Sequence, residues 1–159
     1  MSEISVRVVS PYQPEAIDLV EQMWFDLGKL YGNMGPCEFK PEHIDHANGA
    51  FVVAWLDGVP AGCGAIRPME PIGNSGEDAA ELKRMFVNPD ARRKGVARRV
   101  LAALEERARE IGFDVLRLET GVLQPEAIAL YESQGYLKIA CYGDYAADPT
   151  SVCYEKRLS

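Results

Sequence analysis

The sequence has no long hydrophobic segment and no excess of positive charge. Its longest apolar run, Ala50–Leu56, is far too short to cross a bilayer. The start of the chain shows no basic segment followed by a long apolar region, so we expect no secretory signal. The formal net charge of −7 opposes binding to nucleic acid or to an anionic membrane. We therefore expect a soluble, cytoplasmic protein that acts on small molecules.

Cysteine and histidine are scarce, and their spacing does not indicate a metal site. No two cysteines form a C-x-x-C pair, and a chain of 159 residues has enough core to fold without disulfides, so we expect free thiols. His43 and His46 share one face of a short predicted helix over residues 41–47, but no further ligand spacing accompanies them. We predict that no metal is bound. The four cysteines are Cys37, Cys63, Cys141 and Cys153.

The composition is that of one globular domain, with 47% hydrophobic and 26% charged residues. There is no internal repeat and no linker long enough to divide the chain, so we predict a single domain over residues 1–159. Asp57-Gly58 between two apolar runs predicts a two-residue hairpin. Apolar periodicity and turn residues predict strands at 4–9, 50–56, 60–68, 81–87, 113–119, 136–142 and 151–158, and helices at 14–31, 41–47, 95–111 and 126–134.

The order of these elements predicts an α/β or α+β domain. Strand 81–87, helix 95–111 and strand 113–119 form a βαβ unit, so the two strands should be parallel neighbours. Gly112 stands where a left-handed helix C-cap is expected. We predict a mixed sheet of six or seven strands with helices on both faces.

A cluster of cations surrounds the start of helix 95–111. Such a helix end leaves N–H groups without partners and carries partial positive charge, so cations there cost stability unless an anion is bound. Gly95 lets a ligand approach the backbone closely. This pattern indicates a site for a phosphorylated ligand; the alternative is a solvated basic face with an incidental glycine. The cations are Arg92, Arg93, Lys94, Arg98 and Arg99.

Two blocks of the sequence resemble the GNAT superfamily of N-acetyltransferases. Arg92-x-x-Gly95-x-Ala97 is similar to the signature Q/R-x-x-G-x-G/A, which binds the pyrophosphate of coenzyme A in that family. The block from Ala127 to Tyr136 is similar to the pattern A-x-x-L-Y-x-x-x-G-F/Y. The resemblance covers nearly the whole chain. It implies that the two central parallel strands splay apart, and that acetyl-CoA, with no metal, supplies an acetyl group to a primary amine of a small molecule or peptide by direct attack.

The resemblance also assigns the cofactor site. Gln124 stands where the family usually has an Asn that contacts the cofactor arm. Arg92 would add charge and set the loop, and N–H groups after it would cup the pyrophosphate. The N–H groups are those of Arg93, Lys94, Gly95, Val96 and Ala97. Main-chain groups holding the pantetheine arm and the thioester carbonyl are those of Met85, Phe86 and Val87.

Two catalytic residues follow from the same resemblance. Tyr131 would protonate the leaving thiolate; the alternative is a tyrosine that only packs in the core. Glu81 would act as general base, directly or through water; the alternative is a surface or salt-bridged carboxylate. Glu119 and Thr120 are weaker candidates for facing the acceptor.

The acceptor itself is not determined by the sequence. Its pocket should form from loops 32–40, 70–78 and 143–150, and nothing in them names a ligand. Four aromatic residues near the first loop are candidates for substrate contact, although most should be packing residues: Trp24, Phe25, Tyr31 and Phe39.

Two other functions stay open. A non-catalytic acyl-CoA-binding module would keep the fold, but the presence of both Glu81 and Tyr131 argues against it. A nucleic-acid-binding domain would use the basic loop, but the acidic total charge opposes it. Dimers are frequent among proteins that this chain resembles, so a homodimer is an open alternative for its assembly.

Overall fold

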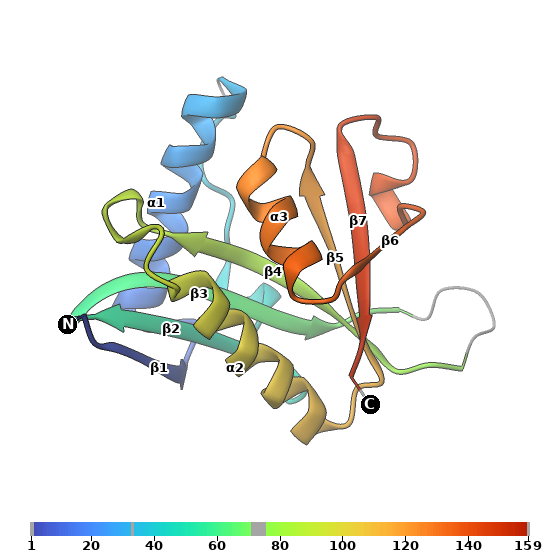
Figure 1. Cartoon of the computed structure of the whole chain (residues 1–159), viewed down its shortest axis with the longest axis horizontal. Coiled ribbons are helices and arrows are strands. Elements are labelled where there is room, and N and C mark those ends of the chain that lie inside the picture. Colours follow the sequence, from blue (N-terminus) through green and yellow to red (C-terminus); the bar gives the residue numbers. More distant parts are fainter. Residues whose placement is uncertain (1, 33, 71–75, 159) are drawn as a thin grey trace.

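The computed structural model describes residues 2–32, 34–70 and 76–158. Its seven strands form one mixed sheet in the order β1-β2-β3-β4-β5-β7-β6, as predicted (Figure 1). In chain order the elements are β1 (Ile4–Val9), α1 (Pro14–Tyr31), η1 (Pro41–His43), β2 (Ala50–Leu56), β3 (Val59–Pro68), β4 (Ala79–Val87), η2 (Pro89–Ala91), α2 (Val96–Ile111), β5 (Val115–Gly121), α3 (Pro125–Ser133), β6 (Leu137–Ile139), η3 (Gly143–Tyr145) and β7 (Ser151–Arg157).

Helices cover both faces of the sheet, as the sequence predicts (Figure 1). On one face α1 buries Leu19, Val20 and Met23 against Phe51 and other residues of β2 to β4. The other face carries α2 and α3. Their buried residues share a second core cluster with β2 to β5 and β7. Burial of these two apolar stripes is the main force that holds the layers together.

Several local predictions are confirmed because they depend on turn chemistry. Asp57 and Gly58 both have positive φ, 51° and 83°, and join β2 to β3 in the predicted hairpin. Gly112 caps α2 with φ 110°. Within α1 Leu19 is fully buried, whereas Leu30 near the carboxyl end is exposed. The last turn of α1 extends beyond the sheet and therefore has no core to enter.

The central parallel strands separate, as the resemblance implies. β4 and β5 are paired only from Ala79↔Val115 to Glu81↔Arg117. Beyond that point, which we call the fork, β4 pairs only with β3 and β5 pairs only with β7. Figure 1 shows the two strands diverging toward their carboxyl ends. Main-chain groups along the inner edges of the fork thus have no neighbouring strand to bond.

A β-bulge interrupts β4 shortly after the fork. Cys63 lies opposite Phe86, but Ala65 lies opposite Lys83, so β4 contains one residue more than β3 over this stretch. Arg84 takes the left-handed conformation there, with φ 59°. Lys83 and Phe86 face α1 because their partners on β3 belong to the core cluster beneath α1. The extra residue therefore re-aims the side chains that follow the fork.

Gly62 and Gly64 mark a close approach of neighbouring elements to β3. A Cβ on Gly64 would lie 2.5 Å from Met85 Sδ and 2.8 Å from Leu104 Cδ1. A Cβ on Gly62 would lie 2.9 Å from both the Phe86 carbonyl oxygen and Val96 Cγ1. Because they have no Cβ, the two glycines allow α2 to pack closely against β3. They also leave room for the bulged part of β4 beside it.

Three expectations are wrong. Residues 41–47 form only the short 3-10 helix η1 and turns, and β6 is shorter than the strand predicted over 136–142. Cys141 and Cys153 form a disulfide, with their Cα atoms 5.1 Å apart, whereas free thiols were expected. The pairing arises because Ile139 of β6 lies opposite Cys153 of β7, and the chain then brings Cys141 back beside it. Cys37 and Cys63 are free.

Candidate cofactor and active site

The predicted phosphate site is a turn with unpaired N–H groups. Residues 92–97, which we call the basic elbow, connect η2 to α2. Arg93 and Gly95 both adopt positive φ, 64° and 86°. Within the described residues, none of the N–H groups of 93–97 donates to a main-chain or side-chain acceptor. Successive free N–H groups in such a turn form a concave anion-binding site, which the helix dipole reinforces.

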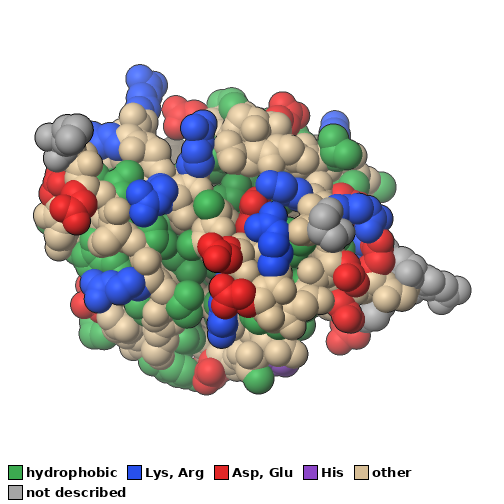
Figure 2. Space-filling model, turned by 60° about the horizontal axis from the view of Figure 1, so that its bottom comes forward, with side chains coloured by type: hydrophobic (Ala, Val, Ile, Leu, Met, Phe, Trp, Pro, Cys, Tyr) green, Lys and Arg blue, Asp and Glu red, His purple; other side chains and the backbone are tan. Residues whose placement is uncertain are grey.

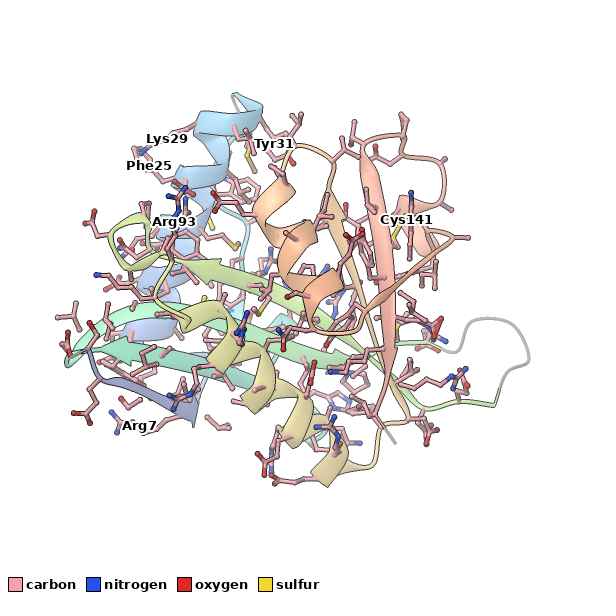
Figure 3. The ribbon with its side chains drawn as sticks, viewed as in Figure 1. Arg7, Phe25, Lys29, Tyr31, Arg93 and Cys141 are labelled. Atoms are coloured by element: carbon pink, nitrogen blue, oxygen red, sulfur yellow. A yellow bond between two sulfur atoms is a disulfide. The ribbon has the colours of Figure 1, made fainter. Side chains whose placement is uncertain are left out.

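Arg92 holds the elbow to the rest of the fold. Its Nε donates to the carbonyl oxygen of Val87 at 3.0 Å, and its Nη2 contacts Asp26 of α1 at 2.7 Å. Asn88 makes a second tie to the same helix through Gln22, at 2.9 Å. Figure 3 shows Arg93 beside α1, near the labelled Phe25 and Lys29. Arg92 thus sets the loop, as the resemblance implied.

The other cations of the elbow are exposed and without ion pairs in the described part of the chain. Arg93 and Lys94 precede Gly95 and stand free in solvent. On the face shown in Figure 2, Lys and Arg side chains are interspersed with Asp and Glu instead of forming one broad basic surface. The elbow is consequently suited to a compact polyanion and not to a long one.

Main-chain groups of β4 face the opening of the fork. The N–H of Asn88 donates to Ala61 of β3 at 2.8 Å, and a Cβ on Gly62 would meet the Phe86 carbonyl. Because main-chain groups alternate in direction along a strand, Met85 and Val87 point to the opposite side, into the gap. Of the three residues whose main chain is predicted to hold the cofactor, Met85 and Val87 are thus the two that face the gap, and the Val87 carbonyl already accepts from Arg92. Phe86 contributes its ring to the core beneath α1.

Tyr131 lies on α3 with its ring in the core on the α2 side of the sheet. It is 5% exposed, and burial raises its pKa above the usual value of 10.0. Its ring contacts that of Tyr136 edge to face, with centroids 5.7 Å apart. Among the described residues the Tyr131 hydroxyl has no hydrogen-bond partner. The hydroxyl of Tyr136, in contrast, bonds Glu105 at 2.8 Å.

Gln124 is the N-cap residue of α3 and bonds Tyr31 of α1, a partner that the sequence does not predict. Its Nε2 donates to the hydroxyl of Tyr31 at 3.3 Å. Tyr31 reaches from the end of α1 toward the connection between β5 and α3 (Figure 3). A Cβ on Gly121 would lie 2.0 Å from that hydroxyl. This bond uses one of the two Nε2 donors of Gln124.

Glu81 stands at the fork and is 6% exposed. One carboxylate oxygen accepts from Arg67 Nη2 at 3.2 Å and lies 3.8 Å from Lys83 Nζ. The other oxygen accepts from the Tyr142 hydroxyl at 3.2 Å. This is the salt-bridged arrangement that the sequence left open. The oxygen that bonds Tyr142 accepts only this one hydrogen bond from the described residues and keeps a second lone pair for a proton.

The loop after β6 supplies residues that sequence reasoning missed. Tyr142 bonds Glu81, and the Tyr145 hydroxyl accepts from Lys83 Nζ at 2.9 Å. The sequence predicts only that this loop lines the acceptor pocket, because nothing in its residues shows which strand it crosses. Two further candidates are half-buried or buried at the end of β5: Glu119 accepts from Ser151, and Thr120 is 7% exposed.

Two hollows adjoin these residues. One of about 420 Å³ lies between α1 and the end of β4, and its lining includes Phe25, Asp26 and Phe86. The second, of about 620 Å³, lies under the loop after β6, and its lining includes Arg117 and Tyr142. Part of the predicted acceptor pocket, residues 71–75 of loop 70–78, falls outside the described residues.

The remaining candidates give no separate chemistry. The Cys63 thiol donates to the Arg84 carbonyl at 3.3 Å, and burial raises its pKa to about 12, so it is a poor nucleophile. Across the described ranges no group of three or more His, Cys, Asp or Glu side chains is placed to hold a metal. None of the helices seen in those ranges has the length and hydrophobicity of a transmembrane segment.

Comparison with known proteins agrees with this geometry. The chain is 37% identical over 158 residues to the IAA acetyltransferase of Azospirillum brasilense, covering 99% of this chain and 100% of that protein. It is 36% identical over 110 residues to the N-acetyltransferase YsnE of Bacillus subtilis, which is uncharacterized, covering 68% and 69% of the two chains.

Solved structures show the same fold. A Klebsiella pneumoniae protein assigned as an acyl-CoA N-acyltransferase superposes with a TM-score of 0.74 at 30% identity, covering 98% of both chains. A Salmonella typhimurium protein assigned as an acetyltransferase, solved with its cofactor acetyl-CoA, has a TM-score of 0.70 at 15% identity, covering 98% of this chain and 94% of that one. The profile of the acetyltransferase (GNAT) family matches residues 15–136. With the basic elbow, the fork and the block around Tyr131 in place, the chain belongs to the acetyltransferase (GNAT) family.

Proposed function

We propose that the protein transfers the acetyl group of acetyl-CoA to a primary amine of a small molecule or peptide by direct attack. The observation that carries this proposal is the fork. It offers main-chain groups of Met85 and the N–H of Val87 at a strand edge that no neighbouring strand pairs, next to an elbow of free N–H groups and exposed cations. A phosphorylated carrier with an extended arm fits those two features together.

The chemistry needs three groups. The main chain of β4 holds the thioester carbonyl and stabilises its developing oxyanion. The amine nitrogen attacks the carbonyl carbon, the C–S bond breaks, and the departing thiolate takes the proton of Tyr131. Glu81 accepts the proton that the amine loses, directly or through water. Because Arg67 and Lys83 engage one oxygen, the other oxygen, which accepts only from Tyr142, is the one that takes this proton.

Names of relatives support the transfer to nitrogen. The Bacillus subtilis relative is named an N-acetyltransferase, and the Klebsiella structure is assigned as an acyl-CoA N-acyltransferase. Acetyl-CoA is bound in the Salmonella structure of the same fold. These names favour an acyl-CoA cosubstrate and an amine acceptor for this chain.

The test is release of the CoA thiol from acetyl-CoA across an amine panel, with mass detection of the N-acetylated product. Tyr131→Phe removes one hydroxyl and should lower kcat by about 100-fold with folding intact. Tyr136→Phe is the matched control, because it removes the neighbouring hydroxyl, which only bonds Glu105. Saturable CoA binding without turnover on any amine would instead identify a non-catalytic acyl-CoA-binding module.

A further inference from the structure

The bulge in β4 gathers positive charge on the α1 side of the sheet. Lys83 and Arg84 follow the fork, and Arg67 of β3 lies opposite Glu81. The Arg84 guanidinium stacks on Phe39 at 5.3 Å, and Phe39 packs against the core beneath α1. Arg84 therefore faces the same side as Lys83, although neighbouring residues of a regular strand face opposite sides.

Negative charge in this group is too small to balance the cations. Arg67 and Lys83 share the single carboxylate of Glu81. The second contact of Lys83 is the neutral hydroxyl of Tyr145. Arg84 makes no ion pair with any described carboxylate. Two positive charges are thus left over, in a chain whose total charge is −7.

The conformation and burial of Arg84 cost free energy, which a bound anion would offset. Its Nε is buried and has no hydrogen-bond partner among the described residues. Burial is the main cause that lowers its pKa, and the nearby Arg67 adds to it. A non-glycine residue at φ 59° is also strained. A buried donor without a partner and a strained backbone are features that persist where a bound group compensates for them.

Arg84 also lies next to the reacting position. It directly precedes Met85, whose main chain faces the gap between β4 and β5. Lys83 and Arg67 keep 20% and 38% of their side-chain surface exposed, so a ligand can reach them. Tyr142, which bonds Glu81, also lines the hollow of about 620 Å³, so there is room for a small molecule nearby.

We propose that the acceptor carries a carboxylate beside its amine, as a free amino acid does, and that Arg84 and Lys83 bind this carboxylate. The inference rests on the proposed acetyl transfer and adds the class of acceptor. A guanidinium binds a carboxylate through two parallel hydrogen bonds, which would supply the partner that Arg84 Nε lacks. Binding there places the α-amine of the amino acid close to the main chain of Met85, which holds the thioester carbonyl.

The experiment compares each of the twenty L-amino acids with its α-amide, which keeps the amine and loses the negative charge. Acetyl transfer from acetyl-CoA is followed by mass detection, with Arg84→Met as the test variant. Arg7→Met is the matched control, since Arg7 also stacks on an aromatic ring, Trp55 at 4.3 Å, but lies on the edge strand β1 (Figure 3). Binding of the same ligands to the CoA-loaded protein is measured in parallel by calorimetry, so that the readout does not depend on turnover.

The proposal expects that the best amino acid exceeds its amide in kcat/KM by about 10- to 100-fold, and that Arg84→Met abolishes this preference mainly through KM. Arg7→Met should retain it. Acetylation of amides as well as free acids, or an unchanged preference in Arg84→Met, would overturn the carboxylate site and leave the acetyltransferase standing. Carboxylate-dependent binding without acetyl transfer to any amine would uphold the site and refute the proposed function.

Discussion

The hydroxyl of Tyr142 donates a 3.2 Å hydrogen bond to the carboxylate of Glu81, the last residue of β4 that pairs with β5. This bond joins the loop after β6 to the fork. It orients the predicted general base and leaves the accepting oxygen a second lone pair for a proton.

Substitution of Glu81 by Gln tests that role. It removes the proton acceptor and keeps the size of the side chain, so kcat should fall by about 100-fold. Glu105→Gln is the control, because Glu105 is also a buried carboxylate bonded by a tyrosine and a lysine, Tyr136 and Lys156. That change should lower stability without changing kcat. An unaltered kcat in Glu81→Gln would leave Glu81 with a structural role only.

Two glycines that both have positive φ make it possible to distinguish an effect on cofactor binding from an effect on stability. Gly95 and Gly112 flank α2 with φ 86° and 110°, and each has open space where a Cβ would stand. Alanine at either position should destabilise the protein by roughly 1–2 kcal/mol. Only Gly95→Ala should also weaken CoA binding in calorimetry, by at least about 10-fold, because its methyl group projects from the basic elbow. Equal CoA affinity in the two variants would contradict a phosphate site there.

The Cys141–Cys153 disulfide should stabilise the β6–β7 edge of the sheet. Its cysteines are 12 residues apart, and closing a loop of that size is worth roughly 3 kcal/mol. Cys141→Ala with Cys153→Ala should lower the Tm, and dithiothreitol should lower the Tm of the unmodified protein to a similar value. Tyr142 follows Cys141 directly, so KM for the acceptor should rise in both cases. Cys37→Ala, at a free cysteine, is the control.

If dithiothreitol does not change the Tm of the unmodified protein, the Cys141–Cys153 disulfide contributes nothing to stability. The compartment matters for this bond, since disulfides persist in oxidising surroundings and are rare in the cytosol.

Three tyrosines, two of them buried and one half-buried, should make the protein sensitive to high pH. Burial is the main cause that raises the pKa of Tyr131, Tyr136 and Tyr142 above 10.0, and Glu105 and Glu81 add to it for the last two. A raised folded-state pKa contributes stability that is complete below pH 10 and is lost as pH rises through the folded-state values. The unfolding free energy should therefore fall above pH 10.

Absorbance of the phenolate at 295 nm should show a late titration phase in the folded protein that merges with the main phase on unfolding. Tyr131→Phe should remove one tyrosine from the late phase. A single phase near pH 10 in the folded protein would contradict the burial of these rings.

The sequence by itself determined the features that depend on neighbouring residues. Helix periodicity and capping residues fix α1 and α2, the Asp57-Gly58 pair fixes the β2–β3 hairpin, and Gly95 fixes the elbow. Each of these is a choice of local backbone conformation, so a few consecutive residues suffice to predict it. The resemblance carried by the elbow and by the block around Tyr131 then pointed to the fork.

Only the tertiary structure decided the features that depend on pairing between distant strands. The register of β3 against β4 places the bulge at Arg84, and the packing of β6 on β7 brings Cys141 to Cys153. The path of the following loop gives Glu81 the hydroxyl of Tyr142. One inserted residue in a strand moves the following side chains to the opposite face of the sheet. The local sequence does not predict which residues they contact there.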